Sequence, residues 1–144
     1  MIRSVGALIG CALLLQWPAA AADNGLRVAA AWARPTPPGS SVGAVYLSII
    51  NRGAAPDRLL ALESPIAAKV EIHQSASVAG MVQMRAVSFV DCPAGATVKI
   101  EPGGLHIMLL GLKGALVAGS SFPLTLQFRD AGRVALQVSV EARE

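Results

Sequence analysis

The sequence is poor in the residue types that most often carry protein chemistry. Its 144 residues include only two cysteines, two histidines and 4% aromatic residues, and 15% are charged. The net charge of +3 is spread along the chain without any run of Lys or Arg. A nucleic-acid surface is therefore not expected, because it needs clustered cations and stacking aromatics. The 53% hydrophobic content excludes intrinsic disorder, and the length suits one domain.

The first 22 residues have the pattern of a secretory signal peptide. Arg3 supplies a positive start, Val5 to Leu15 is apolar, and Ala19 to Ala22 are the small residues that a signal peptidase requires. We expect cleavage after Ala22, which leaves an exported domain at 23–144 with no membrane span. A lipoprotein box ending at Cys11 is the alternative, disfavoured because the apolar run continues past that cysteine.

Cysteine use fits an exported chain. Only Cys92 remains after processing, so the mature domain has no internal disulfide. We interpret Cys92 as a small apolar residue at a strand end rather than as a ligand or redox group, because free cysteine usually behaves as a buried hydrophobe.

Apolar residues alternate with polar ones in short segments that Gly, Pro, Asn and Asp separate. This period of two, with turns every 8–12 residues, is typical of an antiparallel sandwich or barrel. The clearest hairpin is the last pair of segments. The predicted strands are 26–34, 42–51, 56–63, 68–75, 82–90, 96–101, 104–110, 121–129 and 133–141.

Four neutral side chains that bind soft metals occur at a spacing that favours convergence. His106 and Met108 lie two apart on one predicted strand, so both side chains leave the same face. His73 and Met84 lie on consecutive strands whose turn centres near Ala79, and residues equidistant from a hairpin turn oppose one another. This arrangement would let His73, Met84, His106 and Met108 converge from two places in the fold, as candidate ligands of a metal ion.

These donors indicate which ion would bind. Thioether and imidazole suit Cu(I), whereas Mg, Ca and Mn prefer carboxylate oxygen. A divalent ion would leave two charges with no evident carboxylate to offset the cost of desolvation. Met81, beside the turn, is interpreted as a bystander or auxiliary thioether. In the competing interpretation the methionines fill the core and the histidines are only hydrogen-bonded, and the spacing alone leaves both open.

The spacing His73-x10-Met84-x21-His106-x-Met108 resembles the signature of the periplasmic copper chaperone family PCu(A)C. The surrounding sequence resembles this family as well, over residues 31–35, 56–60 and 102–113. The resemblance implies an all-β, cupredoxin-like (immunoglobulin-like) Greek-key β-sandwich that binds one Cu(I) per chain through these four residues. It also implies a periplasmic monomer that delivers copper toward the binuclear centre of cytochrome c oxidase subunit II, with or without a Sco-type thioredoxin-like metallochaperone.

The sequence departs from the family pattern in two places. Many relatives carry Met where this chain has Val82, and some carry a His/Met-rich tail where this chain ends at Glu144, so a second, tail-based copper site is not expected. An enzyme is not expected either, because both histidines belong to the metal motif and the carboxylates are dispersed. General copper sequestration, or a structural domain without metal, are the alternatives to a chaperone.

Overall fold

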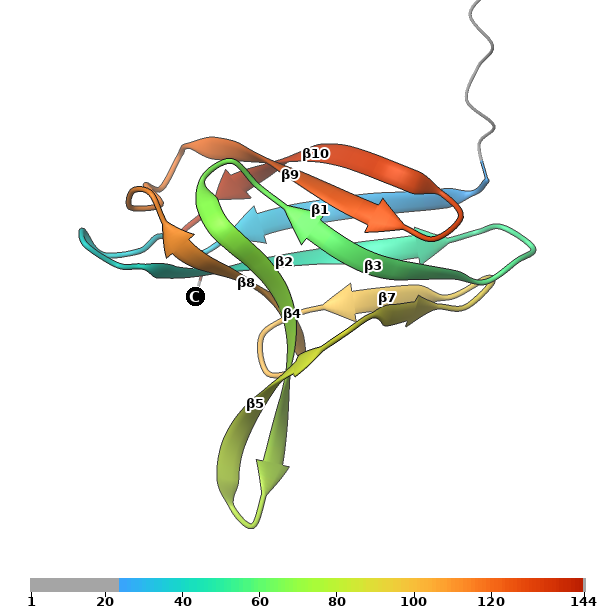
Figure 1. The fold of residues 1–144 in the computed structure, drawn as a ribbon, viewed down its shortest axis with the longest axis horizontal. Helices are drawn as coiled ribbons and strands as arrows, with labels where there is room; N and C mark the ends of the chain where they lie inside the picture. Colours follow the sequence, from blue (N-terminus) through green and yellow to red (C-terminus); the bar gives the residue numbers. More distant parts are fainter. Residues whose placement is uncertain (1–23, 144) are drawn as a thin grey trace, which may run out of the picture.

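The computed structural model describes residues 24–143, and this part of the chain consists of strands and turns without a helix (Figure 1). The all-β class predicted from the sequence is confirmed. No helical membrane span occurs among these residues. The predicted signal peptide, with Cys11, lies outside them. The strands are β1 (Leu26–Ala33), β2 (Val42–Asn51), β3 (Asp57–Glu63), β4 (Ala67–Val78), β5 (Met81–Val87), β6 (Val90–Cys92), β7 (Thr97–Ile100), β8 (Leu105–Leu112), β9 (Ser121–Phe128) and β10 (Gly132–Val140).

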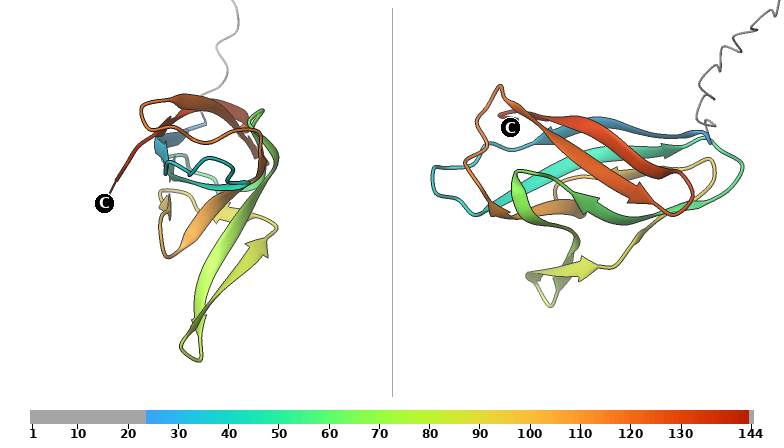
Figure 2. Two further views of the ribbon diagram at one scale, coloured as in Figure 1. Left: turned by 90° about the vertical axis from the view of Figure 1, so that its left-hand side faces the viewer. Right: turned by 45° about the horizontal axis from the view of Figure 1, so that its top comes forward.

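One continuous, curled sheet builds the molecule. Nine strands follow the order β5-β4-β8-β2-β1-β10-β9-β3-β6, and β7 pairs with β2. Of the pairs in the described chain, β1–β10 is parallel and the others are antiparallel. The path curls over so that β3 lies beside β4 without a shared ladder, which gives the two layers seen in Figures 1 and 2.

The core lies between these layers and follows from alternation along the strands. In β9, Leu124, Leu126 and Phe128 are fully buried. They form one face of the strand because successive side chains point to opposite sides. They belong to the same buried cluster as residues of β2 and β8, such as Ile49 and Leu109. Each such side chain contributes about 1.5–3 kcal/mol through burial, so this cluster supplies the main driving force of the fold.

The predicted strand 82–90 is wrong, because the structure divides it in two. Its first part belongs to β5, which pairs with β4, and its last residue begins β6, which pairs with β3 at the other end of the sheet. Ser88 and Phe89 carry the chain between these positions. The alternation of polar and apolar residues continues where the chain passes from β4 to β3 as its partner, so the sequence pattern gives no sign that the partner strand changes.

The β4–β5 hairpin projects from the body of the molecule (Figures 1 and 2). β4 has 12 residues, and its last four, from Ser75 to Val78, have ladder partners only in β5. Near the tip, Val78, Met81, Val82 and Met84 are 49%, 64%, 73% and 62% exposed. The hairpin therefore presents apolar and thioether side chains to solvent.

Candidate metal site

Three of the predicted donors form a compact group on β4 and β8. His73 is the partner of His106 in the ladder between these strands, and the centroids of the two rings are 5.9 Å apart. Met108 follows two residues after His106 and is the partner of Glu71. Because every second side chain of a strand leaves the same face, the three donors and Glu71 share one face of the sheet.

Met84 lies on the same face as His73. The sequence predicted that it would lie directly opposite His73, and it does not. The partner of His73 is Ala86, and Met84 lies two residues nearer the turn. The reason is the turn itself, in which Ala79 and Gly80 both have positive φ, 51° and 79°, as in a two-residue primed turn. Met84 is thus a diagonal neighbour of His73. In such pairs the Cα atoms are about 7–8 Å apart, a span that a long side chain bridges.

His106 differs from a core histidine whose two ring nitrogens are both hydrogen-bonded. The residue is 5% exposed, and its Nδ1 lies 3.1 Å from the carbonyl oxygen of Gly104. A carbonyl only accepts, so Nδ1–H donates and Nε2 carries the lone pair. Among the described residues, Nε2 is buried without a hydrogen-bond partner. Leaving such an atom unsatisfied costs about 1–3 kcal/mol, which a bound metal ion would offset.

His73 is held by a carboxylate that the sequence analysis did not single out. Its Nε2 lies 2.8 Å from Oε2 of Glu71, whose other oxygen forms an ion pair with Lys69. Lys69 first, and His73 second, lower the pKa of the Glu71 carboxyl, which is therefore ionised at neutral pH. The signal that could have revealed Glu71 is its position two residues before His73, on the same face of one strand.

The donor set decides which ions the site suits. Among residues 24–143, no three His, Cys, Asp or Glu side chains come together as a group that could hold a metal ion. The two imidazoles share their face of the sheet with two further neutral donors, the thioethers of Met84 and Met108. Such a mixture of imidazole and thioether ligands suits Cu(I) and disfavours hard divalent ions.

Two other sulfur atoms lie away from this group. Met81 is three residues from Met84 and pairs with Val78, so it leaves the opposite face of the hairpin. Cys92 is 1% exposed in β6, at the other end of the strand order. Burial first, with the charges of Asp57 and Asp91, raises the pKa of its thiol to about 11, so it is protonated at neutral pH. Cys92 is thus a buried apolar residue, as predicted.

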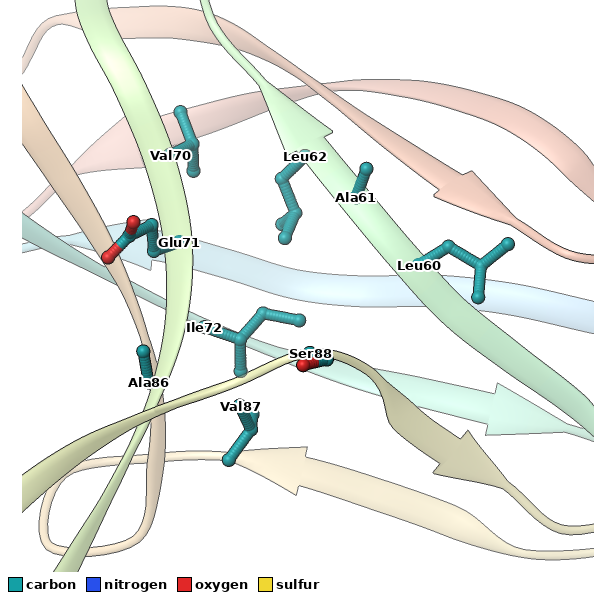
Figure 3. Close-up of a pocket in the computed structure, with 9 residues that line it drawn as sticks. All are labelled: Leu60, Ala61, Leu62, Val70, Glu71, Ile72, Ala86, Val87 and Ser88. Atoms are coloured by element: carbon teal, nitrogen blue, oxygen red, sulfur yellow. The ribbon is translucent and has the colours of Figure 1, made fainter.

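A hollow of about 240 Å³ lies beside the site, between β3 and the β4–β5 hairpin. Figure 3 shows Leu62 and Ile72 pointing into the space between the strands, while the carboxylate of Glu71 points away to the other side of β4. Leu60, Val70 and Val87 complete most of its apolar wall. These side chains offer no metal ligand, so the hollow is distinct from the donor group.

Together, the fold and the donor group define an all-β domain that presents two imidazoles and two thioethers on one face of its sheet. Residues 26–140 match the family described as "Putative lipoprotein LpqE-like", and the chain belongs to this family.

The chain is also similar to two relatives. The chain is 34% identical over 139 residues to "Putative lipoprotein Lxx21020" of Leifsonia xyli subsp. xyli, and this alignment covers 93% of this chain and 82% of that protein. It is 33% identical over 113 residues to "Uncharacterized protein RP573" of Rickettsia prowazekii, and this alignment covers 76% of this chain and 62% of that protein.

Solved structures confirm the predicted resemblance to PCu(A)C domains. The copper-bound PCuAC domain from PmoF2 matches with a TM-score of 0.70 and 25% identity, over 83% of this chain and 94% of that one. The apo PCuAC domain from PmoF1 matches with a TM-score of 0.70 and 28% identity, over 83% and 95%. The Cu(I) form of DR1885 from Deinococcus radiodurans matches with a TM-score of 0.63 and 27% identity, over 77% and 74%. The four donor residues themselves stay a prediction.

Proposed function

We propose that this protein binds one Cu(I) ion through His73, Met84, His106 and Met108 and acts as a copper metallochaperone. The observation that carries the proposal is the buried Nε2 of His106, which has no hydrogen-bond partner in the part of the chain that the structure describes. The ring of His106 lies beside that of His73, and both share a face of the sheet with two thioethers. The copper-bound and Cu(I) forms of related domains support copper as the ion.

The two ends of the donor group differ in exposure, and this difference suits transfer by ligand exchange. His106 is buried, whereas Met84 is 62% exposed on the projecting hairpin. In the proposed exchange, an incoming donor replaces the thioether of Met84 first, while His106 holds the ion until a shared-metal intermediate has formed. Both imidazoles serve as ligands in this scheme, and it includes no catalytic step.

Replacing the thioethers tests the site without disturbing the fold. Met84→Leu and Met108→Leu remove one sulfur each while keeping the volume and apolar character of the side chain. We expect the wild-type protein, purified after export, to take up one equivalent of Cu(I) from a coloured chelator under anaerobic conditions. Each variant should bind more weakly by roughly 100-fold or more, since losing even an outer-shell partner costs about 10–100-fold.

Met81→Leu is the matched control, because Met81 is equally exposed on the same hairpin but leaves the other face. It should bind Cu(I) as the wild type does. The proposal fails if the wild type takes up no Cu(I), or if M84L and M108L match the wild type.

The proposed recipients of the copper are cytochrome c oxidase subunit II, a Sco-type thioredoxin-like metallochaperone, or both. The proposal rests on the family resemblance and on the accessible Met84. Mixing the Cu(I)-loaded protein with a soluble copper-site fragment of either recipient, and separating the two, should move copper to the fragment. If the copper stays on this protein with both recipients, sequestration is the better description.

The proposed location is the periplasm, as the signal-like residues 1–22 predict. The printed names of the family and of one relative describe lipoproteins, which supports export. The mass of the N-terminal peptide of the purified protein distinguishes cleavage after Ala22 from lipid attachment at Cys11.

A further inference from the structure

The two histidines of the site are held by different partners and through different ring atoms. His106 donates from Nδ1 to the carbonyl of Gly104, 3.1 Å away. His73 contacts Oε2 of Glu71 through Nε2, at 2.8 Å. Each contact uses one ring nitrogen and leaves the other for a different role.

The contact between His73 and Glu71 has a direction. An ionised carboxylate accepts hydrogen bonds and has none to give, so the ring must donate from Nε2–H. A neutral imidazole has one N–H, and its second nitrogen, Nδ1, then carries the lone pair. Lys69, paired with the other oxygen of Glu71, holds the carboxylate in place and supports this arrangement.

Glu71 is poorly placed to be a ligand in its own right. Its oxygens are occupied by His73 and Lys69, and it completes no His, Cys, Asp or Glu group that could hold a metal ion among the described residues. Carboxylate oxygen also suits hard ions better than Cu(I). Its contribution must therefore pass through the ring of His73.

We infer that Glu71 is a positioning residue of the copper site, which fixes His73 in the tautomer that offers Nδ1 to the metal, whereas His106 offers Nε2. This inference rests on the proposed Cu(I) site and deepens it. Ligand histidines commonly donate their second N–H to a carboxylate or carbonyl, which fixes the tautomer and the orientation of the ring. Here the carboxylate of Glu71 would hold His73, and the carbonyl of Gly104 would hold His106.

Nitrogen-15 NMR of the imidazole rings, at about pH 8 where neutral histidine predominates, tests the inference. In the metal-free wild type, His73 should be protonated at Nε2 and His106 at Nδ1. Adding one equivalent of Cu(I) should perturb Nδ1 of His73 and Nε2 of His106. In Glu71→Ala the His73 ring should become a mixture of tautomers, and Cu(I) affinity should fall about tenfold or more.

Two further variants separate positioning from a general effect of charge. Glu71→Gln keeps an oxygen that can accept from Nε2–H, so it should restore the tautomer and most of the affinity. Glu63→Gln, at an exposed carboxylate of β3 that pairs with Arg133, should leave both measurements as in the wild type.

The outcomes are distinguishable. The inference is overturned, with the copper site intact, if Cu(I) perturbs Nε2 of His73 instead of Nδ1. The same holds if the wild type binds Cu(I) and E71A changes neither tautomer nor affinity. A wild-type protein that binds no Cu(I) overturns the proposed function, and this inference with it.

Discussion

Two buried polar residues, Asp57 and His106, differ in how their hydrogen-bonding atoms are satisfied. Both carboxylate oxygens of Asp57 accept backbone N–H groups, from Arg58, Asp130 and Ala131. His106 instead keeps Nε2 without a partner among the described residues. A satisfied buried group stabilises the fold, whereas an unsatisfied one costs free energy and points to a ligand. Asp57 therefore stabilises the fold, whereas the unsatisfied Nε2 of His106 supports its proposed role as a copper ligand.

Asp57 makes stability depend on pH. Burial alone would raise its pKa, but the three backbone N–H groups and the charge of Arg129 outweigh burial and lower it below 3.8. A carboxyl with a lowered pKa in the folded state stabilises the protein above its unfolded pKa, and this stability is lost as pH falls through the folded pKa. Asp57→Asn should thus lower the free energy of unfolding by about 1.5–3 kcal/mol at pH 7, and by less below about pH 4.

Urea unfolding of the wild type and of D57N, at pH 7 and below about pH 4, measures the difference in the free energy of unfolding. Asp91→Asn is the control, because that carboxylate is exposed and pairs only at the surface with Arg58. It should change stability by no more than about 1 kcal/mol. A D57N deficit that is the same at both pH values would contradict the explanation.

At the scale of the element, the β4–β5 hairpin decides the geometry of the site. The sequence predicted that the segments carrying His73 and Met84 form a hairpin, but the turn sets its register, and the sequence Val78-Ala79-Gly80-Met81 does not disclose it. Ala79 adopts a φ of 51°, which is uncommon for a residue with a Cβ. Local preference therefore could not predict this turn, and the position of Met84 relative to His73 followed from it.

Ala79 also provides a test of the hairpin. Ala79→Asn would give the Asn-Gly pair that primed turns favour, because Asn tolerates left-handed backbone better than Ala does. We expect the hairpin to gain about 1 kcal/mol, the scale of the left-handed penalty. Slower hydrogen exchange of the β5 amides would report this gain.

Ala94→Asn is the matched control, since Ala94 is also in a turn but has no positive φ. It should leave hydrogen exchange of the β5 amides unchanged. Equal effects of A79N and A94N would mean that backbone strain at Ala79 does not limit the hairpin.

At the scale of the whole molecule, alternation predicted most of what the structure contains. It identified the all-β class and, within a few residues, the bounds of most strands, because one buried face imposes a period of two. It could not predict that 82–90 is shared by β5 and β6, since partner choice depends on contacts far away in the sequence. The same limit applies to the site, where His73 and His106 become partners only when β4 meets β8.

The parallel pairing of β1 with β10 has a kinetic consequence. Trp32 and Ala33 pair with Ser139 and Val140, so the first strand of the described chain cannot complete its ladder until the last one is present. Sheets with such distant partners fold slowly, typically in milliseconds to seconds. The β1–β10 pairs form only once both strands are available, which is compatible with the export that the family's description as lipoproteins supports.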